Sequence, residues 1–270
     1  MTTRLPLRFL LLLPPFLFCT GPTQSATAPQ RDRSAPVANA PLRTEQIVEN
    51  LVRRNLERTH ALHAYMGTRI YQVDYRGFPS GRSAEMVVDV EYQSPGTKEF
   101  TIRSATGSKM IIDKVLKKLL QAEKEALAID AQKHTALNRE NYDFTLVGYE
   151  NNPSGLMYVL TVEPKTKDKF LYRGRIWVDA GDFAVTRLEA EPAKNPSFWT
   201  KNSQIEQVYM KVNGFWLPVR NHSIAEIRLG GTAELTISYS NYRILGKEQV
   251  SDLSTLESKD TIRARRDDHR

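Results

Sequence analysis

The sequence predicts an α+β protein: an unclosed antiparallel β-barrel of about ten strands, with two amphipathic helices covering its concave side. Three observations predict this fold. Ten segments alternate apolar and polar residues with a period of two, which is typical of half-buried strands. Two segments repeat apolar residues with the helical period of about 3.6. The connections between neighbouring strands are short, whereas a parallel crossover needs a dozen or more residues, so the strands are expected to be antiparallel.

The folded region is expected to begin with an amphipathic helix over residues 44–65. Thr44 is a capping residue, Glu45 falls in the first turn, and apolar residues recur at helical spacing from Ile47 to Leu62. This pattern predicts a helix with one face buried against the sheet.

A three-stranded meander is expected next. Its strands are marked by apolar residues that share one face: Tyr71, Val73 and Tyr75 in the first, Ala84, Met86, Val88, Val90 and Tyr92 in the second, and Phe100 and Ile102 in the third. Turn residues at 77–81 and 94–96 separate them.

A second amphipathic helix is expected over residues 109–137, with Ser108 as its capping residue. One face is apolar, and the opposite face carries the lysines Lys114, Lys117, Lys118, Lys124 and Lys133. The helix is therefore expected to bury one face and to expose a basic one.

The chain then returns to strand alternation as far as residue 245. Three strands are marked by Tyr142, Phe144 and Leu146, by Leu156, Tyr158, Leu160 and Val162, and by Phe170, Tyr172, Ile176 and Val178. Four more are expected at about 183–190, 204–213, 216–229 and 232–244. The strands and helices together define one domain, residues 43–245.

The first 26 residues have the three-part layout of a secretory signal. Arg4 and Arg8 precede a short apolar run that ends at Phe18, and small and polar residues follow. Cys19, the only cysteine, raises lipid attachment as an alternative, but the bulky residues before it disfavour that reading. We therefore expect export to the periplasm and a mature chain without a thiol.

Two segments outside the domain have no structural periodicity. Residues 27–42 are rich in Ala, Pro, Ser and Gln, which is typical of a flexible linker. Residues 246–270 form a charged tail that we expect to be disordered. The formal charge of +7, less Arg4 and Arg8 of the signal, leaves about +5 on the exported chain. Basic residues form no dense stripe interleaved with aromatics, so a nucleic-acid partner is not expected.

Motifs for catalysis, metals and cofactors are incomplete. His60 and His63 are three residues apart, but no carboxylate or HExxH pattern accompanies them. Residues 105–109 lack the upstream glycine of a phosphate-binding loop, and residues 77–81 join two strands rather than the strand and helix of a hydrolase nucleophile turn. We therefore expect neither an enzyme nor a cofactor.

Two stretches, Tyr-Arg-Gly-Arg-Ile-Trp-Val-Asp at 172–179 and Phe-Ala-Val-Thr-Arg-Leu-Glu at 183–189, resemble the outer-membrane lipoprotein-sorting family of LolA- and LolB-type periplasmic carriers. Gly-Phe-Trp-Leu-Pro at 214–218 and the closing strand 233–242 follow in the same order. The resemblance covers about residues 43–245. It implies a half-barrel plugged by helices, with a hydrophobic cavity that shelters acyl chains.

Aromatic and apolar residues are the candidate lining of such a cavity. The aromatics outnumber those that two helices could cover, and Phe198 and Trp199 lie in a polar connection, 192–203, where large rings need a burial partner. The predicted ligand-binding residues are Tyr71, Met86, Val88, Phe100, Leu116, Leu120, Tyr158, Trp177, Phe198 and Trp199.

Two functions follow as hypotheses. The first is a monomeric, non-catalytic periplasmic carrier of an acyl chain, lipid or lipoprotein, with a membrane surface or receptor protein as a further partner. The second is an envelope sensor or scaffold that binds a protein partner through the same fold. The basic face of residues 109–137 and the charged tail would then be its contact surfaces.

Overall fold

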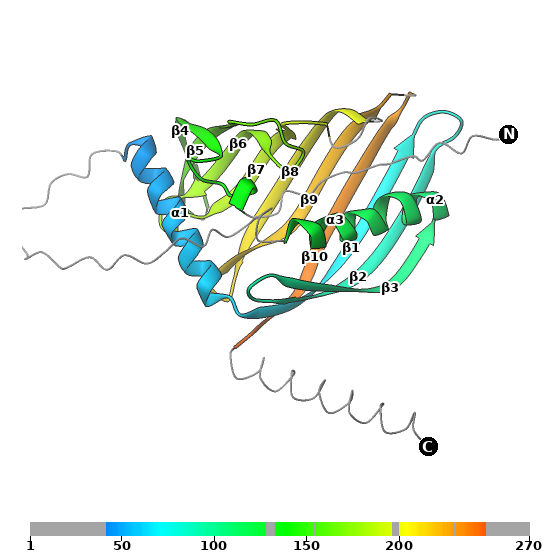
Figure 1. Cartoon of the computed structure of the whole chain (residues 1–270), viewed down its shortest axis with the longest axis horizontal. Coiled ribbons are helices and arrows are strands. Elements are labelled where there is room, and N and C mark those ends of the chain that lie inside the picture. Colours follow the sequence, from blue (N-terminus) through cyan, green and yellow to red (C-terminus); the bar gives the residue numbers. More distant parts are fainter. Residues whose placement is uncertain (1–41, 128–132, 154, 196–199, 229, 247–270) are drawn as a thin grey trace, which may run out of the picture.

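The described residues form one ten-stranded antiparallel sheet with helices on one of its faces (Figure 1). The computed structural model describes residues 42–127, 133–153, 155–195, 200–228 and 230–246. The expected signal, Cys19, the linker up to residue 41 and the tail from residue 247 lie outside these residues. The predicted fold class, an open antiparallel sheet with covering helices, is confirmed.

The strands follow the predicted segments closely. Their bounds are β1 Ala64–Arg76, β2 Arg82–Gln93, β3 Thr97–Gly107, β4 Tyr142–Asn152, β5 Gly155–Pro164, β6 Tyr172–Asp179, β7 Val185–Pro192, β8 Thr200–Val212, β9 Phe215–Ile227 and β10 Thr232–Leu245. β7 begins two residues later than expected, because Asp179 Oδ1 accepts the backbone N–H groups of Gly181 and Asp182 and holds a turn there. β8 begins earlier than expected, at Thr200.

The first strand pairs with the last, so the ends of the domain meet in the middle of the sheet. The strand order is β3-β2-β1-β10-β9-β8-β7-β6-β5-β4. β3 and β4, which follow one another in the chain, therefore lie at opposite edges. The connection between them has to pass across one face of the sheet, and this places the second helical segment on that face.

The first helix, α1 (Thr44–Ala61), packs over the β4 end of the sheet, with Ile47 and Leu51 fully buried. It is shorter than the predicted 44–65, because Tyr65 pairs with Tyr92 of β2, where their rings stack at 5.2 Å. Arg43, not Thr44, occupies the capping position. The Thr44 hydroxyl accepts a hydrogen bond from the backbone N–H of Leu146 instead.

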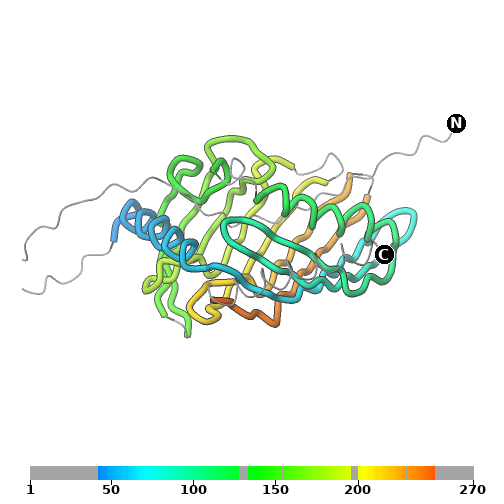
Figure 2. The backbone as a smooth tube through the Cα atoms, turned by 60° about the horizontal axis from the view of Figure 1, so that its bottom comes forward, coloured from blue at the N-terminus to red at the C-terminus, as the bar shows by residue number. Residues whose placement is uncertain are grey.

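The second helical segment consists of α2 (Lys109–Ile111), one π-helical turn η1 (Ile112–Leu116) and α3 (Lys117–Ala126). It crosses the β3 end of the sheet (Figures 1 and 2). α3 ends at Ala126, short of the predicted end at residue 137, although residues 133–135 are helical again. Residues 128–132 lie outside the described part, and beyond them the Asn138 side chain accepts the N–H groups of Glu140 and Asn141, a turn that competes with helix.

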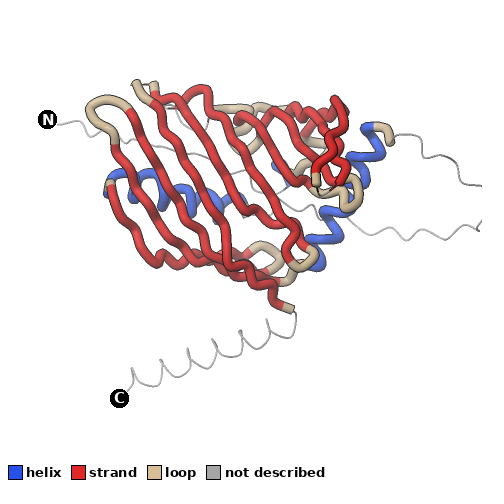
Figure 3. The backbone as a smooth tube through the Cα atoms, turned by 180° about the vertical axis from the view of Figure 1, so that it is seen from behind, coloured by secondary structure: helices blue, strands red, loops and turns tan. Residues whose placement is uncertain are grey.

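Both helical segments cover the same face, which we call the inner face. Figure 3, seen from behind, shows the strands in front and the helices on the far side. The opposite side is called the outer face. Among the described helices, none combines the length and apolar character that a bilayer-spanning helix needs.

Candidate functional site

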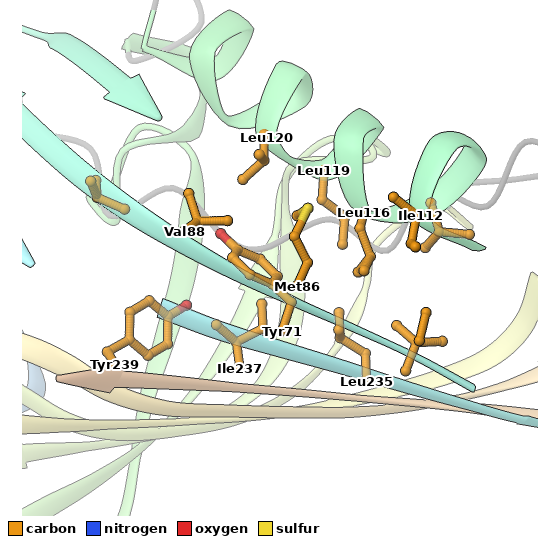
Figure 4. Packing of buried hydrophobic residues seen from close by; sticks show 14 of the residues in the cluster. Tyr71, Met86, Val88, Ile112, Leu116, Leu119, Leu120, Leu235, Ile237 and Tyr239 are labelled. Carbon is orange, nitrogen blue, oxygen red and sulfur yellow. The ribbon is translucent and has the colours of Figure 1, made fainter. Parts of the chain in front are cut away.

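The inner face carries a packed apolar cluster beneath α2 and α3, which we call the α3 cluster. Figure 4 shows side chains of the sheet and of the helix directed toward one another. The cluster unites strands β1, β2, β9 and β10 with the helical segment, and it contains five of the predicted ligand-binding residues: Tyr71, Met86, Val88, Leu116 and Leu120. Phe100, half-buried on β3, packs against its margin.

A second apolar cluster, the α1 cluster, lies at the other end of the inner face. Ile47 and Leu51 of α1 pack there on strands β4 to β8. The predicted residue Tyr158 belongs to this cluster, where its ring stacks on Phe183 at 6.1 Å. The predicted lining residues on the inner face are therefore divided between two separate clusters.

Trp177 lies on the outer face, so its prediction as an inner lining residue is wrong. Its neighbours Ile176 and Val178 both belong to the α1 cluster, and alternation along β6 turns Trp177 the other way. The indole Nε1 donates to Glu150 Oε2 at 2.6 Å, and the Arg187 guanidinium lies 4.8 Å from the ring centroid. These polar partners bury the ring without a ligand.

Phe198 and Trp199 lie outside the described residues, so their predicted role stays a prediction. The connection in which they were expected is shorter than predicted. β7 continues to Pro192, and Ser203 lies within β8, almost fully buried, rather than in a loop.

A buried ion network ties α3 to the sheet. Glu123 of α3 accepts from Arg69 of β1 at 2.7 and 3.1 Å and from Lys98 of β3 at 2.8 Å. Only 5% of the Arg69 side chain and 12% of the Glu123 side chain are exposed. The Arg69 guanidinium also donates to the Tyr71 hydroxyl at 3.1 Å and lies 4.9 Å from the Tyr239 ring centroid.

The two cations set the protonation state of Glu123. Burial opposes ionisation of the carboxyl group, but the attraction of Arg69, and then of Lys98, outweighs it and lowers the pKa of Glu123 to about 2. Glu123 is therefore ionised at neutral pH. Sequence reasoning missed this network, although Arg69 shares a strand face with Tyr71 and Val73, an unusual place for an arginine.

A neutral polar strip separates the two apolar clusters. It consists of Ser203 and Gln207 of β8 and Asn221 and Ser223 of β9, which we call the polar seam. Each is 2% or 3% exposed. Asn221 Nδ2 donates to Gln207 Oε1 at 2.8 Å. Gln207 Nε2 and the hydroxyls of Ser203 and Ser223 have no hydrogen-bond partner among the described residues.

Strand register shows how the seam interrupts the apolar surface. One row across the inner face begins at Leu188, in the α1 cluster. It continues through Gln207 and Asn221 of the seam and ends at Ile237, in the α3 cluster. The next row joins Ala190, Ile205, Ser223 and Leu235. Each row thus passes from apolar to polar and back to apolar over three strand spacings, about 14 Å.

The outer face carries a groove of about 790 Å³ across β5 to β9. Charges of opposite sign face one another across its strands: Arg175 lies 3.1 Å from Glu189, and Arg187 lies 3.3 Å from Glu206. Because these pairs are partly exposed, each is worth at most about 1 kcal/mol. Three arginines and four glutamates line the groove, so its charges nearly balance.

The described residues contain no group of three or more His, Cys, Asp or Glu side chains arranged to hold a metal ion. α1 ends before His63, so the expected placement of His60 and His63 on one helix is wrong. His222 lies on the outer face, 2.8 Å from Glu234.

No protein-family profile matches this sequence, and no curated protein matches it either. Solved structures do match. A DUF1329 family protein from Desulfovibrio piger has a TM-score of 0.39 at 14% identity, over 74% of this chain and 92% of its own. An outer membrane lipoprotein-sorting protein domain from Vibrio parahaemolyticus has 0.36 at 11%, over 76% and 95%.

A LolA superfamily protein from Nitrosomonas europaea has a TM-score of 0.33 at 11% identity, over 76% of this chain and 94% of its own. The family that the sequence resembles thus recurs among the matched structures. Likeness at this level does not bear on function, which rests on the geometry of the chain itself.

Proposed function

We propose that this protein is an exported, non-catalytic binder and carrier of a hydrophobic ligand, which it holds on the inner face of the sheet. One observation carries the proposal. A domain usually has one contiguous apolar core, whereas this inner face has two, each beneath its own helix. Leu188 and Ile237, which belong to different clusters, lie in one row with the seam between them.

A ligand that lies along this row would join the two clusters. Burying an alkyl chain contributes about 0.8 kcal/mol per CH₂, so about ten methylenes correspond to about 8 kcal/mol and to micromolar affinity. The resemblance of the sequence to periplasmic carriers points to the same class of ligand. We further propose that residues 1–26 direct export and are removed, so that the mature chain begins between Thr20 and Pro29.

Binding of a neutral, environment-sensitive alkyl probe, pyrenyldecane, tests the proposal. We expect micromolar or tighter binding to the folded protein and displacement by lipid extracted from the cell envelope. Ile237→Ala, which removes apolar surface from the row, should weaken binding by the folded protein, whereas the matched change Thr236→Ala, one residue along β10, should not. Absence of probe binding by well-folded protein would contradict the carrier.

A protein-binding scaffold is the second candidate, favoured by the outer-face groove. Its balanced charges suit a polar partner rather than a hydrocarbon chain. The two functions separate in experiment. Charge reversal at Arg175 would weaken a partner complex and leave probe binding unchanged, whereas Ile237→Ala would weaken probe binding and leave the partner complex unchanged.

A further inference from the structure

We infer that the polar seam recognises the carbonyl group of a neutral acyl ester or acyl amide, with hydrocarbon on both sides of it in the two apolar clusters. This inference rests on the proposed carrier function and names the chemical class of its ligand. Its basis is the set of unpartnered polar atoms that lie between the two apolar clusters of the inner face.

Such atoms are costly unless something pairs with them. Leaving a buried donor or acceptor unsatisfied costs about 1 to 3 kcal/mol, and most buried polar side chains in native proteins have a partner. Here Gln207 Nε2 and the hydroxyls of Ser203 and Ser223 are all unpartnered within the described residues. Three such groups on two adjacent strands indicate a site that a ligand completes.

The identity of these atoms selects the ligand chemistry. An amide N–H is a donor, and a hydroxyl group can donate or accept, so the site offers donors to a carbonyl oxygen. Gln207 Oε1 already accepts from Asn221, and this bond directs the two remaining Nε2 hydrogens elsewhere. The seam is therefore preorganised mainly to donate.

Charge argues against a free carboxylate as the ligand. All four seam residues are neutral, and Arg69, on the nearby strand β1, already forms an ion pair with Glu123. Burying a carboxylate without a cation costs far more than burying an ester or amide. Apolar neighbours at both ends of each row fit a carbonyl that has hydrocarbon on either side.

The experiment compares ligands that differ only at this group. Octyl nonanoate, N-octylnonanamide and nonyl octyl ether, in which hydrocarbon lies on both sides of the differing group, are each titrated against bound pyrenyldecane. We expect the dissociation constant of at least one carbonyl ligand, measured by displacement of the probe, to be about tenfold lower than that of the ether. One or two net hydrogen bonds would give this difference. Preference for the ester indicates a glycerolipid-like source, and preference for the amide indicates an N-acylated one.

Two variants on the same strand assign the effect to the seam. Gln207→Leu should reduce the ratio of carbonyl to ether affinity to about one, while probe binding persists. Gln204→Leu changes an exposed glutamine three residues away and should leave the ratio unchanged. If Gln207→Leu fails to fold, Ser223→Ala provides the same test with a smaller change.

The possible failures are distinguishable. Equal displacement of the probe by all three compounds in the unaltered protein would overturn the inference but would not contradict the proposed carrier function. A carbonyl preference that survives both Gln207→Leu and Ser223→Ala would also overturn it. If the folded protein does not bind pyrenyldecane, the proposed function itself fails, and the inference with it.

Discussion

Arg69 of β1 and Glu123 of α3 form a two-point ion pair beneath the helix, with the guanidinium nitrogens 2.7 and 3.1 Å from the two carboxylate oxygens. The two residues are 54 positions apart in the chain. The apolar contacts that this helix makes with the sheet in the α3 cluster are non-directional. The ion pair therefore defines the position of α3 on the inner face in a way that the apolar contacts alone do not.

Removing the charge of Glu123 is expected to destabilise the fold. Glu123→Gln leaves Arg69 and Lys98 buried without a counter-ion, and breaking a buried pair in this way costs about 3 to 5 kcal/mol. Denaturant unfolding at pH 7 measures the loss. Glu125→Gln, at an exposed position of the same helix, should cost less than about 1 kcal/mol. Equal losses in the two variants would refute the special role of Glu123.

The same pair predicts a dependence of stability on pH. The pKa of Glu123 in the folded state, about 2, lies below its ordinary value of 4.5. The contribution of the carboxylate to stability is therefore complete above about pH 4.5 and declines as the pH falls toward 2. The difference in unfolding free energy between the unaltered protein and Glu123→Gln should be smaller at pH 3 than at pH 6. A constant difference would contradict the lowered pKa.

The alternation of β2 predicts opposite outcomes at adjacent positions. Met86 and Val88 are fully buried in the α3 cluster, whereas Val87 between them is half-buried and points to the outer face. Met86→Glu or Val88→Glu should prevent folding or remove more than about 3 kcal/mol, because an unpaired charge would be buried. Val87→Glu should cost less than half as much in thermal or denaturant unfolding. Similar losses at all three positions would contradict the register.

Replacement of Trp177 should lower the stability of the protein without changing its affinity for the probe. Trp177→Ala should lower the unfolding free energy by about 3 to 5 kcal/mol, the usual cost of deleting a buried Trp. Because the ring lies on the outer face, pyrenyldecane should bind the folded fraction with unchanged affinity. Leu116→Ala, in the α3 cluster, should alter both quantities. Weaker probe binding by folded Trp177→Ala protein would place the ligand on the outer face instead.

Local patterns predicted most of the fold. Period-two alternation found all ten strands, and it placed Met86 and Val88 on the buried face correctly. Helix ends were less predictable, because partners distant in the chain decide them. Tyr65 leaves the first helical pattern to stack on Tyr92, a contact that exists only once β1 and β2 pair.

The candidate site was harder to predict than the strands. The pattern of apolar residues found many members of both clusters, such as Met86 and Leu160, but not the boundary between the clusters, which arises where β8 meets β9. Gln207 and Asn221 become neighbours only through that pairing. The prediction for Trp177 was wrong because an aromatic residue was expected to face inward. Its neighbours Ile176 and Val178 face inward, and alternation along the strand turns Trp177 outward.

Native mass spectrometry of the mature protein, purified gently from the envelope of its own cells, tests the carrier most directly. We expect a folded monomer with a bound molecule that, once ejected and fragmented, yields an acyl chain attached through a neutral ester or amide. We also expect Gln207→Leu protein purified in parallel to carry less of this molecule than Gln204→Leu protein does. A folded, export-processed chain that shows only its unliganded mass would contradict the carrier function.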